Sequence, residues 1–179
     1  CPSGIDNTCN KRFEWQLGEL PKGYDHKYTY SHLGYNLKPL DIQAAIGREQ
    51  LKKLPTFIEQ RRKNAQYFAD LFKDHSFLQI QKEIGSSSWF GFSLVLKEES
   101  PISRSNLAKI LATNKIEYRP IVTGNFLKNQ EVLKYFDYEI HEEMIDANYV
   151  DQNGLFIGNH HTDITPEIDL LFNAISKSL

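Results

Sequence analysis

Residues 30–45 read YSHLGYNLKPLDIQAA, a polar turn followed at once by a helical pattern. Pro39 suits the first turn of a helix, because the N–H that proline lacks would have no partner there. Two interpretations of the GYN turn stay open. It is an ordinary turn that enters a helix, or its backbone N–H groups, the Asn36 amide and the Lys38 ammonium together hold a phosphate.

The helical pattern continues well beyond this turn. Apolar residues recur at helical spacing up to Leu54, and Pro55 is expected to end or kink the helix. A second helical run then extends from Phe57 to about residue 74. We therefore expect a long kinked helical connection over residues 38–76, preceded by an irregular arm, residues 1–37, which contains a short strand or extended segment.

The remainder, residues 77–179, is predicted to form a small C-terminal domain. Strand patterns cover 77–81, 88–96, 115–121 and 154–158, and helical patterns cover 103–113, 129–136, 143–152 and 165–177. Ser103 or Ser105 is the expected N-cap of one helix and Thr165 that of the last. The element order favours an α/β fold with a small mixed sheet and helices packed on one face.

The composition limits the binding partners and the cellular compartment that we expect. The chain has 21 basic and 23 acidic residues, so its charge gives no reason to expect nucleic acid or an anionic membrane as a partner. No stretch approaches the roughly 20 apolar residues of a membrane span. Two cysteines are too few for a secreted disulfide scaffold, so we expect a cytoplasmic protein. Since the only methionine is Met144, we also expect the chain to be part of a longer one.

Both cysteines lie in CPSGIDNTCNKRF, residues 1–13. Thiolates at Cys1 and Cys9 can bind zinc or an iron–sulfur cluster, but a closed site needs four ligands. A short disulfide loop and two idle thiols are the alternatives.

The stretch EYRPIVTGNFLKNQ, residues 117–130, places Arg119 at a strand end before a turn at Gly124 and Asn125. Such a loop can clamp a phosphate or a hydroxyl-rich ligand, or it is a surface arginine beside a plain turn. SSSWFGF, residues 86–92, is a core strand in which Trp89 or Phe90 can line a pocket. His160 and His161 are adjacent, a pattern that rarely makes a metal site without nearby carboxylates.

Three stretches together, residues 1–13, 23–54 and 117–130, resemble the DegT/DnrJ/EryC1/StrS sugar aminotransferase family. Within it they resemble the branch of CDP-4-keto-6-deoxyglucose-3-dehydrase and lipopolysaccharide-biosynthesis dehydrases. The resemblance implies the C-terminal part of the pyridoxal phosphate-dependent aspartate aminotransferase (type I) fold. The turn and helix of residues 35–45 resemble a feature of the whole family, whereas the spacing of the two cysteines resembles the 3-dehydrase branch alone.

The resemblance also implies roles for individual residues. Cys1 and Cys9 would be two of the four ligands of a [2Fe–2S] cluster. Asn36 and Lys38 would hold the cofactor phosphate, Asn36 across the interface of a homodimer. The residues implied for the substrate are Tyr30, His32, Arg119 and Asn125. The catalytic residue, a histidine in these dehydrases, would lie upstream of this chain.

The implied reaction is C3 deoxygenation of a CDP-4-keto-6-deoxyhexose, a nucleotide sugar, in deoxysugar and lipopolysaccharide biosynthesis. Pyridoxamine 5'-phosphate, or pyridoxal 5'-phosphate, would be the electron sink, and a flavin iron–sulfur reductase would deliver electrons through the cluster. A sugar aminotransferase with lysine in place of the histidine is the nearest alternative. The other is a non-catalytic dimerisation or binding fragment, and this chain alone is expected to be inactive.

Overall fold

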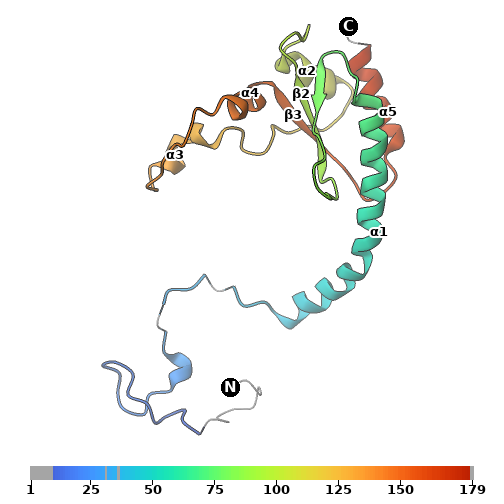
Figure 1. Cartoon of the computed structure of the whole chain (residues 1–179). Coiled ribbons are helices and arrows are strands. Elements are labelled where there is room, and N and C mark those ends of the chain that lie inside the picture. Colours follow the sequence, from blue (N-terminus) through green and yellow to red (C-terminus); the bar gives the residue numbers. More distant parts are fainter. Residues whose placement is uncertain (1–9, 31, 36, 178–179) are drawn as a thin grey trace. The chain divides into compact units, whose positions relative to one another are not determined.

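The computed structural model describes residues 10–30, 32–35 and 37–177 of the chain (Figure 1). The chain divides into two compact units, residues 1–46 and 47–179. Helix α1 (Asp41–Phe72) crosses the boundary between them. The three-part division at residues 37 and 76 stays a prediction, but the second half of α1 belongs to the hydrophobic core of the second unit.

The first unit is held together by local polar and aromatic contacts. Its described residues contain one regular element before α1, the single-turn helix η1 (His26–Tyr28), and no strand. The Arg12 Nε donates to Asp25 Oδ2 at 2.9 Å, and the ring of Trp15 stacks on His26 with 5.2 Å between centroids. Part of the expected arm is therefore a small folded cluster, and its described residues contain no strand.

Pro55 does not end α1, which continues through it as one helix of 32 residues. Figure 1 shows a bend in the first half of the helix, in agreement with the expected kink. Beyond the proline, burial of one side stabilises the helix, because the buried residues recur at helical spacing. They are Asn64, Ala65, Phe68 and Phe72.

The second unit contains a three-stranded sheet in the order β1–β2–β3. The strands are β1 (Leu78–Ile80), β2 (Gly91–Leu96) and β3 (Gly154–Gly158). Both pairs are antiparallel, with Leu78 opposite Leu96 and Phe92 opposite Ile157. The sheet is thus antiparallel throughout, and the expectation of a mixed sheet was wrong in this respect.

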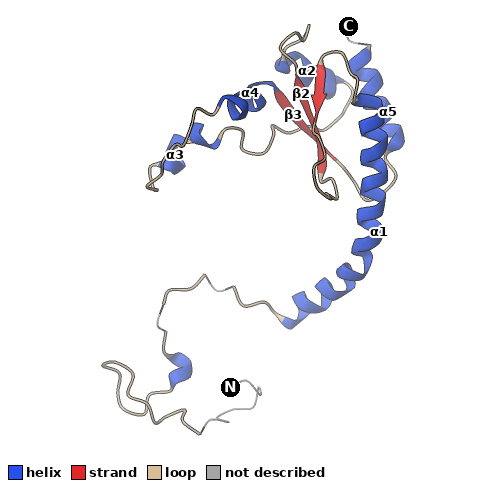
Figure 2. Ribbon diagram, in the orientation of Figure 1, coloured by secondary structure: helices blue, strands red, loops and turns tan. Residues whose placement is uncertain are grey.

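One face of the sheet carries the hydrophobic core. Phe92, Leu94 and Leu96 alternate along β2 and are buried, as strand geometry requires for a face covered by helices. Covering this face are α1, α2 (Arg104–Thr113) and α5 (Thr165–Ser176), as Figure 2 shows. The helices contribute Ala65, Phe68, Phe72, Leu107, Leu111, Ile168, Leu171 and Ile175 to the core.

Helix α4 (Ile145–Asn153) packs where the other face of the sheet is exposed. Its Tyr149 hydroxyl donates to the Leu96 carbonyl at 2.8 Å, and Tyr149 lines a hollow together with Ser93 and Val95. Two further short elements, η2 (Phe126–Lys128) and α3 (Gln130–Leu133), precede α4 in the chain. Helices therefore cover one face fully and the other in part.

Of the two helix N-caps predicted from the sequence, one is confirmed and the other is wrong. Ser103 is the N-cap of α2 and accepts from the Asn106 N–H at 3.2 Å, as predicted. Thr165 is not the N-cap of α5. Instead the Asp163 carboxylate accepts from the Thr165 N–H at 3.0 Å and from its hydroxyl at 2.9 Å. These hydrogen bonds lower the pKa of Asp163.

The side chain of Gln81 extends the sheet beyond the end of β1. Its Nε2 donates to the Gly91 carbonyl at 2.9 Å, and its Oε1 accepts from the Ser93 N–H. The amide side chain therefore satisfies backbone groups of β2 that have no strand partner on that side, because β1 ends at Ile80.

Candidate functional site

An open pocket of about 680 Å³ lies at the end of the sheet in the second unit. It is bounded by the segment that leads into β2 and by the segment after residue 118. The lining residues are Gln81, Ser87, Trp89, Phe90, Gly91, Arg119, Pro120, Val122, Thr123 and Phe156. The pocket thus brings together Arg119 and the two aromatic residues that the sequence marked as possible pocket residues. We call it the Arg119 pocket.

Two stacked rings form an aromatic wall of this pocket. Phe90 and Phe156 lie 5.8 Å apart between ring centroids, with 21° between their planes. Gly91 permits this arrangement, because a Cβ there would lie 2.3 Å from Phe156 Cζ and 2.4 Å from the Ile157 carbonyl oxygen. Phe90 is 75% exposed, so its ring offers a face to a bound molecule.

Arg119 is held at the pocket by its backbone. Its N–H donates to the Phe156 carbonyl at 2.8 Å, and its carbonyl accepts from the Phe156 N–H at 2.7 Å. This isolated bridge is all that forms of the predicted strand at 115–121, since Pro120 has no N–H to continue the pairing. The Arg119 side chain is exposed, with Glu117 Oε1 3.8 Å from its Nη2.

Strained backbone occurs on both sides of the Arg119 pocket. Trp89 has a φ of +54° and Val122 a φ of +49°. Left-handed backbone is costly for such bulky or β-branched residues, about 1–3 kcal/mol each. The Trp89 N–H donates to Ser87 Oγ at 2.8 Å, which helps to hold the first of these conformations. Strain of this kind gathers at binding sites, where a fixed backbone positions the side chains.

Asn125, the second substrate residue expected in this unit, is buried. Its Oδ1 accepts from the Leu127 N–H at 3.0 Å, which caps η2, and its Nδ2 donates to Asn148 Oδ1 at 2.8 Å. The Asn125 side chain therefore stabilises the loop through these two hydrogen bonds. A direct contact with substrate stays a prediction.

A second link ties the same loop to α4. Lys128 Nζ donates to Asp151 Oδ2 at 2.6 Å. This hydrogen bond, together with the Lys128 charge and the Asn125 backbone, lowers the pKa of Asp151 despite some loss of hydration. Gly124 has a φ of +65°, which favours glycine, and a Cβ there would lie 1.9 Å from Asp151 Oδ1 and would displace that carboxylate.

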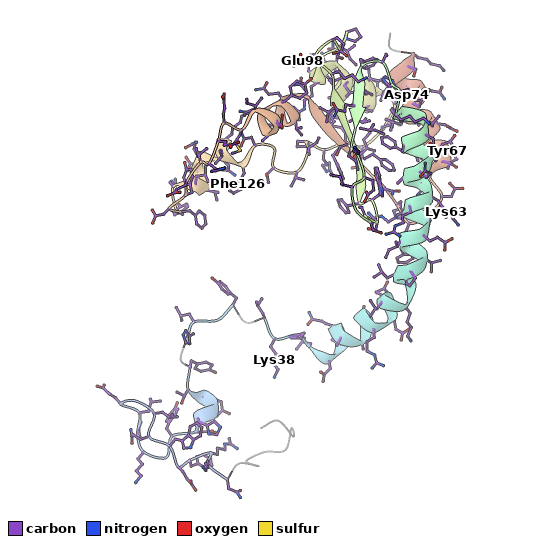
Figure 3. The ribbon with its side chains drawn as sticks, viewed as in Figure 1. Lys38, Lys63, Tyr67, Asp74, Glu98 and Phe126 are labelled. Atoms are coloured by element: carbon purple, nitrogen blue, oxygen red, sulfur yellow. The ribbon has the colours of Figure 1, made fainter. Side chains whose placement is uncertain are left out.

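The other predicted site residues belong to the first unit. Tyr30, His32 and Lys38 are exposed, and Figure 3 shows Lys38 in the segment before α1. Asn36, Cys1 and Cys9 lie outside the described residues. The roles of all six stay predictions.

Sequence analysis missed the two asparagines that support the aromatic wall. Asn159 Nδ2 donates to the Trp89 carbonyl at 3.0 Å and to the Arg61 carbonyl at 2.9 Å. Asn64, fully buried in α1, donates to Asn159 Oδ1 at 3.1 Å. A polar residue among the apolar positions of α1 is the only signal that could have marked Asn64, and Asn159 lies in an ordinary-looking turn.

The part of the chain that the structure describes contains neither a cluster of metal ligands nor a helix that could span a membrane. Its histidine, cysteine and acidic side chains form no group of three that could hold a metal ion. None of its helices is long and apolar enough to cross a membrane.

Known proteins resemble the chain over most of its length. It is 56% identical over 154 residues to the GDP-4-keto-6-deoxy-D-mannose 3-dehydratase of Yersinia pseudotuberculosis, a match that covers 86% of this chain and 39% of that protein. It is 42% identical over 180 residues to the lipopolysaccharide biosynthesis protein RfbH of Salmonella typhimurium, with 99% and 41% covered.

A solved structure of GDP-4-keto-6-deoxymannose-3-dehydratase with a trapped PLP-glutamate geminal diamine, where PLP is pyridoxal phosphate, matches with a TM-score of 0.79. The identity is 54%, over 83% of this chain and 38% of that one. The expected fold class is confirmed by this likeness. The chain spans about two fifths of the length of these relatives.

The DegT/DnrJ/EryC1/StrS aminotransferase family matches residues 16–166, which include α1, the sheet and the Arg119 pocket. Because this match covers most of its residues, the chain belongs to the DegT/DnrJ/EryC1/StrS aminotransferase family.

Proposed function

We propose that the chain is the C-terminal part of a pyridoxamine phosphate-dependent enzyme that removes the C3 hydroxyl of a nucleotide-linked 4-keto-6-deoxy sugar. The observation that carries this proposal is the identity of 56% over 154 residues to a 3-dehydratase. Two nucleotides are candidates. The sequence resemblance implies cytidine diphosphate, and the name of that relative contains guanosine diphosphate. Since the catalytic histidine is expected outside this chain, we expect the 179-residue chain alone to show no turnover.

The Arg119 pocket is the part of the described structure that fits this substrate. The Arg119 guanidinium can donate two parallel hydrogen bonds to a phosphate of the nucleotide. The rings of Phe90 and Phe156 offer flat apolar faces to a sugar or base and exclude water from one side of it. Asn125 lies in the loop that follows Arg119. Its hydrogen bond to Asn148 of α4 anchors that loop.

Asn36 and Lys38 are the residues that we propose for the cofactor phosphate, Asn36 across a homodimer interface. Lys38 is exposed before α1 and can supply a positive charge, although as a point charge rather than the two-pronged donor of an arginine. The bound cofactor supplies an amine for the C4 ketone and a ring that accepts electron density. Tyr30 and His32, in the same unit, are proposed to orient the sugar.

Cys1 and Cys9 are proposed as two thiolate ligands of a [2Fe–2S] cluster that receives electrons from a flavin iron–sulfur reductase. A cluster of this kind requires four ligands. The chain holds two cysteines, so the other two ligands must come from outside it.

Amino-group transfer is the second candidate function. The solved structure of GDP-4-keto-6-deoxymannose-3-dehydratase holds a trapped PLP-glutamate geminal diamine, so we include glutamate as an amino donor to be tested here. If the present protein uses glutamate in the same way, it needs neither the cluster nor the reductase for turnover.

The test uses the full-length protein with CDP- and GDP-linked 4-keto-6-deoxyhexoses, and mass spectrometry of the products. A product that has lost the C3 oxygen supports the dehydrase, and a product that has gained an amino group supports the aminotransferase. Parallel reactions with the reductase or with L-glutamate show which supplies the reducing or amino equivalents. Turnover with glutamate alone would remove the cluster from the proposal.

The pocket assignment is tested with Arg119→Gln. One lost hydrogen bond to a charged group should raise KM about ten- to a hundredfold. Lys73→Gln is the matched control, since it removes one exposed charge directly after the end of α1. An unchanged KM in Arg119→Gln would show that the substrate binds elsewhere.

A further inference from the structure

A second, smaller pocket adjoins the Arg119 pocket on the other side of Phe90, which lines both. It measures about 280 Å³, and all its lining residues belong to the second unit. They are Leu54, Phe57, Ile58, Arg61, Ser88, Phe90, Asn159, His160 and His161. This lining includes one arginine and two histidines but no carboxylate, so the pocket favours a negative ligand.

Arg61 is the cation of this pocket, and it is incompletely satisfied. Its guanidinium carbon lies 5.5 Å from the centre of the Phe90 ring. Its Nε is buried and has no hydrogen-bond partner among the described residues. A buried donor without a partner is costly, so an acceptor that reached Nε would be bound favourably.

His160 and His161 add donors on the far side of the pocket. Their rings stack with 4.2 Å between centroids, and the ring of His161 lies 4.0 Å from that of Phe57. His160 Nδ1 is paired with Thr162 Oγ1 at 3.0 Å, which fixes the ring and leaves Nε2 as its second polar atom. The Ser88 hydroxyl lies in the same lining.

The walls of the pocket are held by partly buried hydrogen bonds. Asn64 Nδ2 donates to the carbonyl oxygens of His160 at 3.0 Å and Thr162 at 2.8 Å. Asn159 joins the loop to the Arg61 carbonyl. The donors of the pocket are therefore carried by a fixed loop and a helix, which lowers the entropy lost when a ligand binds.

We propose that Arg61, His160, His161 and Ser88 form a binding site for a phosphate group. The planar guanidinium suits a tetrahedral oxyanion, and the apolar floor of Phe57 and Phe90 strengthens the attraction by excluding water. The volume of about 280 Å³ is at the lower end for ligand pockets, so it accepts a phosphate group but not a whole nucleotide.

The phosphate has two possible sources, free phosphate or a phosphate of a nucleotide whose remainder extends past Phe90. The proposal needs only the anion. It stands without the proposed dehydrase function, because the four residues that would bind the anion have no role in that proposal and only Phe90 is shared with the Arg119 pocket.

The test is calorimetric titration of the 179-residue chain with inorganic phosphate and, separately, with GDP. Arg61→Gln removes the cation and leaves the Asn159 contact, which is made to the Arg61 backbone. Lys63→Gln is the matched control, because Lys63 points away from the sheet on the same helix and pairs with Glu59 (Figure 3). Circular dichroism confirms that each variant folds.

We expect Arg61→Gln to weaken phosphate binding about ten- to a hundredfold, Arg61→Lys to weaken it less, and Lys63→Gln to leave it unchanged. Weakened binding of GDP as well assigns the site to a nucleotide phosphate, and weakened binding of inorganic phosphate alone assigns it to the free anion. Equal affinities in Arg61→Gln and the unmodified chain overturn the proposal. So does loss of phosphate binding in Arg119→Gln alone, which would place the anion in the Arg119 pocket.

Discussion

Asn64 Nδ2 in α1 donates to Asn159 Oδ1 in the loop after β3 at 3.1 Å, across 95 positions of sequence. Asn64 is fully buried, and Asn159 in turn holds the Trp89 carbonyl. One pair of asparagines therefore links helix α1, the loop after β3 and the segment that leads into β2, which lines the Arg119 pocket.

Asn64→Ala should lower the free energy of unfolding by about 2–4 kcal/mol, because it removes the buried amide whose Nδ2 holds Asn159 Oδ1 and the carbonyl oxygens of His160 and Thr162. Urea unfolding of the 179-residue chain measures this loss. Gln66→Ala is the control, since Gln66 is exposed and should change stability by less than about 0.5 kcal/mol. Additive effects of Asn64→Ala and Asn159→Ala would contradict a coupled pair.

Gly91 and Gly158 face each other across β2 and β3, and only Gly91 lacks space for a side chain. Gly91→Ala should destabilise the chain by about 1–3 kcal/mol, because its Cβ meets the Phe156 ring and the Ile157 carbonyl oxygen. Gly158→Ala meets no atom within 4 Å and should be tolerated. Thermal unfolding of the two variants distinguishes them, and equal destabilisation would mean that the strands separate to make room.

His75 should make the chain less stable in acid. Burial among Phe72, Phe77 and Phe172 lowers the pKa of His75, and the nearby Lys97 lowers it further. The unfolded chain therefore binds the proton more readily. Stability is complete above the unfolded pKa of about 6.5 and is lost as the pH falls through that value toward the folded pKa.

His75→Phe should reduce this loss of stability, measured by urea unfolding at about pH 7.5 and about pH 5. His141→Gln is the control, because His141 is exposed and its removal should leave the pH dependence as it is. An identical pH dependence in His75→Phe and the unmodified chain would show that other groups cause it.

Asn36→Ala in the full-length protein should weaken pyridoxamine phosphate binding about ten- to a hundredfold, since a hydrogen bond to a charged phosphate is worth roughly 1.5–3 kcal/mol. Fluorescence titration of the cofactor measures the dissociation constant. Asn106→Ala, on the exposed side of α2, is the control. An unchanged constant in a folded Asn36→Ala protein would return the GYN segment to the ordinary-turn interpretation.

Cys9→Ser in the full-length protein, purified without oxygen, should abolish the visible absorbance of an iron–sulfur cluster and leave cofactor binding intact. The reason is that the cluster loses one of four thiolates, whereas the cofactor phosphate uses other residues. Thr8→Ala should retain the absorbance. Simultaneous loss of both groups in Cys9→Ser would indicate a structural role for the cysteine instead.

Local sequence signals predicted the elements of the second unit well. The runs that became β1, β2 and β3 are short and mostly apolar, and Ser103 has the side chain that an N-cap requires. Two expectations failed. Ile164 is the N-cap of α5, and Thr165 is already its first residue, paired with the Asp163 carboxylate. The strand at 115–121 shrank to one bridge at Arg119 because the next residue is Pro120.

The sequence predicted some of the residues of the Arg119 pocket. Arg119, Trp89 and Phe90 were each considered as pocket residues beside the alternatives of a surface arginine and a core strand, and the fold brings all three to one pocket. The burial of Asn125 was not predictable, because its partner Asn148 lies 23 positions away on a helix whose packing no local pattern reveals.

The Gln81 side chain, which completes the hydrogen bonding of β2 beyond β1, also has a consequence for solubility. An uncovered strand edge can recruit a strand from a neighbouring molecule and start aggregation. Here the edge of β2 near Gly91 and Ser93 is already occupied by an amide, and β1 itself is only three residues long. A single glutamine thereby occupies the backbone groups of β2 through which a strand of a neighbouring molecule could pair with the sheet beside the Arg119 pocket.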